Sequence, residues 1–192
     1  MTDLNAKIFE PRVSDLVGDI RDIGCDTKFK EILIVGDEGI ACLTASGKII
    51  SKRRLPRRME IIGRQRTPKG WRVLVLDNLE LSILSIPDDS SPEVLLSGTV
   101  TNALTARWNP DGHLVAIGSE GTELFVYNSQ NGQMQWKGSV VWDTDELITP
   151  PKLSVQGWTQ DGKCIITTAE YLAALTCNIW DAYTGKLLTF ID

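Results

Sequence analysis

A short pattern of turns and apolar runs recurs along this chain and limits the folds that it can adopt. Its clearest copy extends from Arg107 to Trp136, where the turns Trp108–Gly112, Gly118–Gly121 and Asn128–Gly132 separate apolar runs of strand length. These runs are rich in β-branched and aliphatic residues and are bounded by Gly, Pro, Asn, Asp or Ser. The pattern predicts short antiparallel strands joined by tight turns.

The same turns return elsewhere in the sequence. The segment Val35–Gly39 recurs as Ile117–Gly121, and Trp108–Gly112 has counterparts at 66–70 and 158–162. The turns expected after each third strand are Thr44–Gly47, Asn128–Gly132 and Asp181–Gly185, with the Pro/Ser-rich stretch Pro87–Pro92 in the second unit. A period of about 40 residues indicates a repeat architecture rather than a single irregular sheet.

The apolar runs between these turns are the expected strands. They are 32–35, 40–43, 73–76, 81–86, 114–117, 124–127, 165–168 and 175–180, and the outer strands expected to close the four units are 48–55, 93–97, 133–141 and 186–191. Sustained helical periodicity with caps is absent from the sequence. Only Leu4–Gly18 is ambiguous, and Pro11 weakens it as a helix.

The expected fold is all-β: a β-propeller-type array of four four-stranded antiparallel blades. The blades span about 19–56, 57–100, 101–142 and 150–192 and together form one domain over 19–192. A small twisted sheet cannot bury both faces alone, but stacking such sheets buries them. Residues 1–18 form an N-terminal segment, of which Lys7–Asp15 could pair with an outer strand as a latch.

The third and fourth units resemble blades of WD-repeat proteins. The residues that carry the resemblance are Trp108–Gly112 with the strands that follow it, and Gly157–Gly162 with Asn178-Ile-Trp180-Asp181. The resemblance implies a non-enzymatic protein-interaction scaffold that binds a macromolecular partner through blade loops. The first unit matches moderately and the second weakly, and the Gly-His pair common in such blades is missing.

Four units are about half of the seven or eight blades usual in WD-repeat rings. Either another copy or another chain completes the ring, or the four units form a small assembly of their own. An unpaired blade face would expose apolar surface that requires a cover. We therefore expect a protein partner or a second copy of this chain.

A second resemblance involves the turn before Trp136. Asn128–Trp136 is similar to the Asp-x-x-Thr-Gly-x-x-x-Trp docking motif of quinoprotein-type propellers. Asp181–Gly185 begins the same motif, but Thr189 stands where the tryptophan should be, and Ser51 stands there in the first unit. The alternative function implied is a propeller that binds a quinone-type cofactor.

Composition bounds the class of protein. The 192 residues, with 42% hydrophobic and 23% charged residues, suit one soluble globular domain. The N-terminus lacks the apolar core of a signal peptide, and apolar runs of membrane-spanning length are absent. The four cysteines show no Cys-x-x-Cys spacing, which favours free thiols in a reducing compartment. The expected location is cytoplasmic.

The sequence gives little support for catalysis. Its one histidine, His113, falls in an expected surface turn, so neither a His-rich metal site nor a second imidazole is available. Glycine-rich phosphate-binding motifs are absent as well. We expect no catalytic residues, no metal site and no cofactor.

Charge provides the first candidate binding surface. The segment Lys48–Arg72 holds ten basic residues and only one acidic residue, Glu60, although the whole chain has a net charge of -5. The candidate partner-binding residues in this basic band are Lys52, Arg53, Arg54, Arg57, Arg58, Arg64 and Arg66. Such a band attracts acidic protein segments or, alternatively, nucleic acid or an anionic surface through 52–72. It could also simply protect an outer strand edge from pairing.

The long connection Lys137–Lys152 provides the second candidate. It holds Trp142 among acidic residues, and Trp136 lies just before it. An exposed tryptophan can anchor an interface, although either ring could instead pack on its own sheet. Trp108 has a positional counterpart in Trp158, whereas Trp136 has none in its sibling units, which makes Trp136 the more informative of the pair.

Overall fold

The computed structural model describes residues 14–55, 59–77, 79–86, 94–98, 100, 102–140, 151–171 and 174–191. The fold over these residues is all-β, with one short helix and four four-stranded antiparallel sheets. The chain divides into two compact units, residues 1–59 and 60–192. Each unit is described by itself.

The first unit contains one helix and the first sheet. Its elements are α1 (Ser14–Val17), β1 (Ile20–Asp26), β2 (Glu31–Gly36), β3 (Gly39–Thr44) and β4 (Ile49–Arg54), and the strands are ordered β1-β2-β3-β4. Helix α1 packs on the first sheet: Val17 is fully buried in a cluster with Ile34, Ala41 and Leu43. Gly36 permits this approach, because an added Cβ would lie 2.2 Å from the Val17 carbonyl oxygen.

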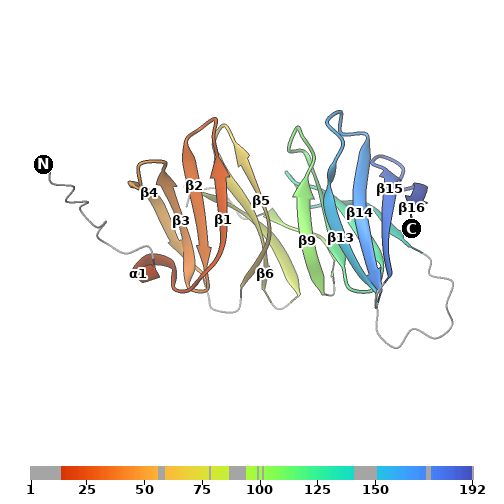
Figure 1. Cartoon of the computed structure of the whole chain (residues 1–192), viewed down its shortest axis with the longest axis horizontal. Coiled ribbons are helices and arrows are strands. Elements are labelled where there is room, and N and C mark those ends of the chain that lie inside the picture. The colour runs from red at the N-terminus through yellow and green to blue at the C-terminus, as the bar shows by residue number, and fades with distance from the viewer. Residues whose placement is uncertain are drawn as a thin grey trace, which may run out of the picture. The chain divides into compact units, whose positions relative to one another are not determined.

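The second unit contains three sheets, each a simple meander. The second sheet consists of β5 (Glu60–Thr67), β6 (Gly70–Asp77), β7 (Glu80–Ile86) and β8 (Val94–Leu95). The third consists of β9 (Ala103–Trp108), β10 (Leu114–Ser119), β11 (Glu123–Asn128) and β12 (Met134–Ser139). The fourth consists of β13 (Lys152–Trp158), β14 (Cys164–Tyr171), β15 (Ala174–Asp181) and β16 (Leu187–Ile191) (Figure 1).

The structure confirms the predicted all-β fold of four blade-like units of four antiparallel strands. Every apolar run named from the sequence lies inside an observed strand, although β8 is much shorter than the outer strand expected at 93–97. In the ambiguous stretch Leu4–Gly18, the described residues 14–18 include the single turn of α1. Most of the predicted latch, Lys7–Asp15, lies outside the described residues.

Equivalent turns of the third and fourth sheets form the same hydrogen bonds. The Asn109 side chain accepts from the backbone N–H of Leu114 at 2.9 Å, and the Thr159 hydroxyl accepts from Cys164 at 3.0 Å. The next turn repeats as well: the side chains of Asn128 and Asp181 each accept from two backbone N–H groups further along the turn. Short polar side chains at these positions therefore stabilise the repeated turns.

The three sheets of the second unit pack face to face in series. One face of the second sheet, with Leu74 and Ile83, shares a core with Trp108, Ile117 and Phe125 of the third. The opposite face of the third sheet packs on the fourth; the residues of this core include Ala116, Leu124, Val126, Leu153, Val155, Ile165 and Trp180. Both faces of the middle sheet are therefore buried, as stacking of blades requires.

Indole N–H groups of two tryptophans form hydrogen bonds between and within these sheets. Trp158 Nε1 in the fourth sheet donates to the Arg107 carbonyl oxygen in the third at 2.9 Å. Trp180 Nε1 donates to the Thr167 hydroxyl at 2.9 Å within the fourth sheet, where the relative exposures of Trp180 and Thr167 are 1% and 0%. The aromatic rings thus supply apolar area while their polar atoms find partners.

Candidate functional site

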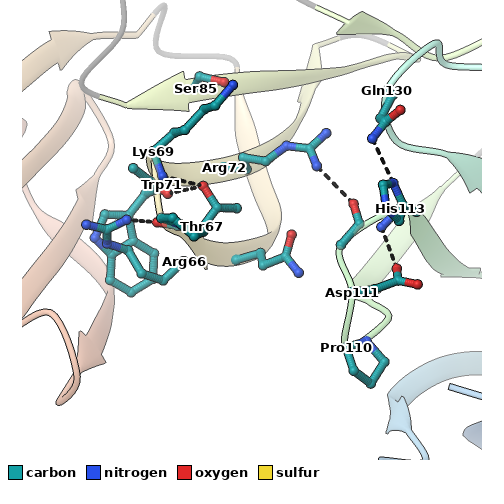
Figure 2. A pocket seen from close by; sticks show the side chains of 14 residues that line it. Arg66, Thr67, Lys69, Trp71, Arg72, Ser85, Pro110, Asp111, His113 and Gln130 are labelled. Carbon is teal, nitrogen blue, oxygen red and sulfur yellow. Dashed lines mark hydrogen bonds between the residues drawn. The ribbon is translucent and has the colours of Figure 1, made fainter. Parts of the chain in front are cut away.

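A pocket of about 600 Å³ lies at the turn end of the second and third sheets. The second sheet contributes the β5–β6 turn with the start of β6, and the third contributes the turns at 110–113 and 130 (Figure 2). The repeat explains this meeting, because the equivalent turns 66–70 and 108–112 fall at the same end of neighbouring sheets. We call this site the basic pocket, defined by Arg66, Lys69, Arg72, His113 and Gln130.

Arg72 reaches across from the second sheet to the third. Its guanidinium donates to the Gly112 carbonyl oxygen and to the Ser129 hydroxyl, both at 3.1 Å, and also to the Ser129 carbonyl oxygen. The Ser129 hydroxyl donates in turn to the Gly112 carbonyl oxygen at 2.6 Å, which fixes the acceptor group. All three acceptors of Arg72 are neutral, so its positive charge is not neutralised by them.

Partial burial affects the chemistry of Arg72. Desolvation lowers the pKa of its guanidinium from the ordinary 12.5, as expected for a cation withdrawn from water. An arginine remains protonated at neutral pH despite such a shift. Its guanidinium carbon also lies 5.8 Å from the centre of the Trp108 ring, within range of a cation–π contact.

The wall from the third sheet is polar and exposed. Gln130 Nε2 and His113 Nδ1 are 2.7 Å apart, and the His113 backbone N–H donates to the Asp111 side chain at 2.8 Å. Gly112 has a φ of 77°, and an added Cβ would lie 3.0 Å from Gln65 Oε1 in the second sheet. The turn therefore needs glycine both for its conformation and for the close approach of the two sheets.

The wall from the second sheet carries two more cations. Arg66 donates to the Thr67 carbonyl oxygen, and the Thr67 hydroxyl donates to the Gly70 carbonyl oxygen at 2.9 Å. Lys69 is exposed, and no ion pair to it occurs in the described part of the chain. Trp71 also lines this side of the pocket, and only 4% of its surface is exposed.

Positive charge dominates the lining of the basic pocket. Arg66, Lys69 and Arg72 line it together with a single carboxylate, Asp111. In Figure 2, Arg66, Lys69 and Trp71 lie on one side and Asp111, His113 and Gln130 on the other, with Arg72 between them. This excess of positive charge attracts an anionic group.

The structure separates the predicted basic band into parts. Lys52, Arg53 and Arg54 lie on β4 of the first unit, whereas Arg64 and Arg66 lie on β5 of the second. Burial, and secondarily the nearby charge of Arg107, lowers the pKa of Arg64. Among the candidates that the structure describes, Arg66 alone lines the basic pocket. Arg57 and Arg58 lie outside the described residues, so their part of the prediction stays a prediction.

Trp136 contacts the fourth sheet. Its Nε1 donates to the Ala182 carbonyl oxygen at 2.8 Å, and a Cβ added at Gly185 would lie 2.7 Å from its ring. The half-buried indole thus covers the glycine of the Asp181–Gly185 turn and joins the third sheet to the fourth. This packing accounts for Trp136 within the protein, and partner contact by it stays a prediction, as it does for Trp142, which lies outside the described residues.

Sequence reasoning did not select the partners that the third sheet supplies to the basic pocket. The sequence places His113 in a surface turn and gives no signal for Gln130. The signal was present in the repeat: matched turns of adjacent blades lie at one end of the array, so 66–72 and 110–113 should meet. Applying that register to the charges would have predicted a site from both turns.

Fold and site together define a class: an all-β protein of stacked blade-like sheets with a basic pocket between the turns of two neighbours. No protein-family model matches the chain, and comparison with curated proteins finds no match. The described residues contain no group of three or more His, Cys, Asp or Glu side chains placed to hold a metal ion. They also include no helix long and apolar enough to cross a membrane.

Proposed function

We propose that this protein is a non-enzymatic interaction scaffold, resembling WD-repeat proteins, that binds an acidic segment of a partner protein in the basic pocket. The observation that carries the proposal is that Arg66, Lys69 and Arg72 all line one pocket between two sheets. Arg72 is held in place by three hydrogen bonds to the neighbouring sheet. Fixed donors bind an anion with little loss of side-chain entropy.

The residues that line the pocket favour a protein carboxylate over nucleic acid as the ligand. Binding of single-stranded nucleic acid generally combines basic residues with aromatic rings on which bases stack. Trp71 is the aromatic residue that lines this pocket, and it is 96% buried, so its face is not available as a stacking platform. The side-chain amide of Gln130 adds a neutral hydrogen-bonding group beside the cations, which suits carboxylate oxygens.

The tryptophan of the quinoprotein-like motif, Trp136, has a structural role. Trp136 and Gly185 contact each other between the third and fourth sheets, away from the residues that line the basic pocket. Packing between sheets accounts for Trp136, and Gln130 of the same motif lines the basic pocket. We therefore propose the acidic-partner function in preference to cofactor binding.

The test is binding of a fluorescein-labelled polyglutamate peptide, measured by fluorescence anisotropy at low ionic strength. We expect the double variant Arg66→Glu/Lys69→Glu to weaken binding by about tenfold or more, because two donors become like charges. The matched control is Lys163→Glu/Lys186→Glu, which makes the same change of net charge at exposed residues of the fourth sheet. The control should bind as the unmodified protein does.

Three results would overturn the proposal. The unmodified protein could fail to bind polyglutamate, or the control variant could lose as much affinity as the pocket variant. A single-stranded oligonucleotide of equal charge could also displace the peptide at far lower concentration, which would indicate nucleic acid as the ligand. Unchanged circular dichroism of both variants shows that the fold is retained.

A further inference from the structure

The outer face of the fourth sheet is built like a face that another sheet covers. Each sheet of the second unit has an apolar cross-strand pair on its two middle strands. The pairs are Leu74 with Ile83, Ala116 with Val126, and Ile166 with Ile179. The first two pairs are buried under the following sheet, with exposures of 0 to 2%.

The third of these pairs has no such cover. Ile166 and Ile179 are only half-buried, and neither belongs to the core between the third and fourth sheets. Leu175, Cys177 and Ile191 share their face, because Cys177 pairs with Ile191 and Leu175 lies two residues before Cys177. Leu175 and Ile191 are 61% and 57% exposed. We call this surface the outer face of the fourth sheet.

The first strands of the second and fourth sheets, β5 and β13, each contain a glycine that can be compared between the two sheets. Gly63 of β5 pairs with Leu74, Gly157 of β13 pairs with Ile166, and each follows a β-bulge. A Cβ at Gly63 would lie 2.7 Å from the Ala106 carbonyl oxygen in the third sheet. A Cβ at Gly157 would meet no atom within 4 Å. The backbone at Gly157 thus leaves open space on the outer side of the fourth sheet, whereas Gly63 is in close contact with the third sheet.

We propose that a second copy of this chain covers the outer face, and that the two fourth sheets pack face to face about a two-fold axis. The charges on this face match that symmetry. Lys152 and Glu170 are cross-strand neighbours on this face, so a two-fold axis can bring the cation of each copy to the anion of the other. Asp181, the further carboxylate on this face, is hydrogen-bonded within its own turn. Two-fold interfaces, in which the same patch faces itself, are the commonest in soluble oligomers. This inference does not depend on the basic pocket.

Other covers are less consistent with the structure. The first sheet already carries α1 on one of its faces, with Val17 fully buried there. A head-to-tail contact between the first sheet of one copy and the fourth sheet of another would have to accommodate that helix. The fourth sheet has no comparable element among the described residues.

Sedimentation velocity of the full chain over a micromolar concentration series tests the proposal. We expect a concentration-dependent dimer that Leu175→Lys/Ile191→Lys dissociates, with dimer affinity weakened by about tenfold or more. The matched control is Leu188→Lys/Phe190→Lys, at residues 51% and 61% exposed in the same sheet. Phe190 pairs with Asn178, which puts it and Leu188 on the opposite face, so the control should still dimerise.

Thiol labelling identifies the face directly. Cys177 lies on the outer face, whereas Cys25 is exposed on the first sheet. Mass spectrometry of alkylated peptides should show that Cys177 reacts more slowly as dimer forms, while the rate at Cys25 does not change. Three results would each overturn the proposal: a monomer at every concentration, a dimer that Leu175→Lys/Ile191→Lys leaves intact, or slower labelling of Cys25 as dimer forms.

Discussion

Substitution by alanine at two similarly placed glycines should change the free energy of unfolding in opposite directions. Gly63 and Gly157 both follow a bulge on the first strand of a sheet and pair with an apolar residue of the second strand. Neither has a positive φ, so alanine can adopt both backbone conformations. Only Gly63 faces a neighbouring backbone, in which the Ala106 carbonyl oxygen and Cβ would lie 2.7 and 2.8 Å from the new methyl group.

The expected difference in stability between the two variants comes from overpacking, which occurs at Gly63 but not at Gly157. Replacing glycine by alanine restricts the unfolded chain equally in both variants and stabilises by about 0.4–1 kcal/mol. Gly63→Ala additionally forces the second and third sheets apart by several tenths of an ångström, and overpacking of this kind costs about 1–3 kcal/mol. The difference between the two variants is therefore about 1–3 kcal/mol, or about 2–12 °C in Tm for a chain of this length.

Tryptophan fluorescence during urea unfolding is the suitable assay. All six tryptophans lie within residues 60–192, so the signal reports on the second unit and is not mixed with unfolding of the first. Dilute protein keeps self-association out of the measurement. We expect Gly157→Ala to unfold at a urea concentration equal to or slightly above that of the unmodified protein, and Gly63→Ala clearly below it. Equal midpoints for the two variants would refute the close packing of the second sheet on the third.

Three further predictions concern buried and turn hydrogen bonds. Thr167→Val leaves Trp180 Nε1 buried without its acceptor and should destabilise by about 1–3 kcal/mol in urea unfolding, unlike the exposed control Thr189→Val. Bonds from Thr184 N–H, then the Thr184 hydroxyl and Tyr183 N–H, lower the pKa of Asp181. This carboxylate thus stabilises the fold above its unfolded pKa and loses that effect as the pH falls through the folded pKa, so Asp181→Asn should flatten the acid branch of Tm against pH. Arg72→Lys cannot reproduce the forked contacts to Gly112 and Ser129 and should lower stability by about 1.5–3 kcal/mol per charged bond lost, whereas an unchanged Tm would contradict the bridging role.

Local signals were enough to predict most of the fold. Strand length, turn chemistry and repeat period all depend on residues near one another in the sequence, and these placed the strands and the four sheets correctly. The equivalence of Asn109 with Thr159, and of Asn128 with Asp181, is a chemical one: each supplies a side-chain oxygen to the backbone N–H groups of its turn. Such turns need no tertiary context, because the acceptor and its donors lie within five residues.

The candidate site was harder to predict because it depends on contacts between sheets. A count of charges identified the band from 48 to 72 but did not show which members converge. Arg66, Lys69 and Arg72 line one pocket only because the second sheet stacks on the third with their turns aligned. Trp136 presents the same difficulty: its sequence context was equally compatible with a partner contact and with packing, and the Ala182 carbonyl oxygen lies 46 residues further along the chain.

The strand sequences themselves bear on the outer face of the fourth sheet. A strand with one wet face alternates apolar and polar residues, whereas a strand buried on both faces is apolar without interruption. β10 reads Leu-Val-Ala-Ile and is buried on both faces, because the second and fourth sheets lie against the third. β14 keeps apolar residues at Cys164, Ile165 and Ile166, and β15 adds Cys177 and Ile179 on the side away from the third sheet. The outer face of the fourth sheet therefore has apolar side chains at its centre, at Ile166, Cys177 and Ile179, and polar ones around them at Lys152, Thr168 and Glu170. An apolar centre with a polar rim is the distribution typical of an interface.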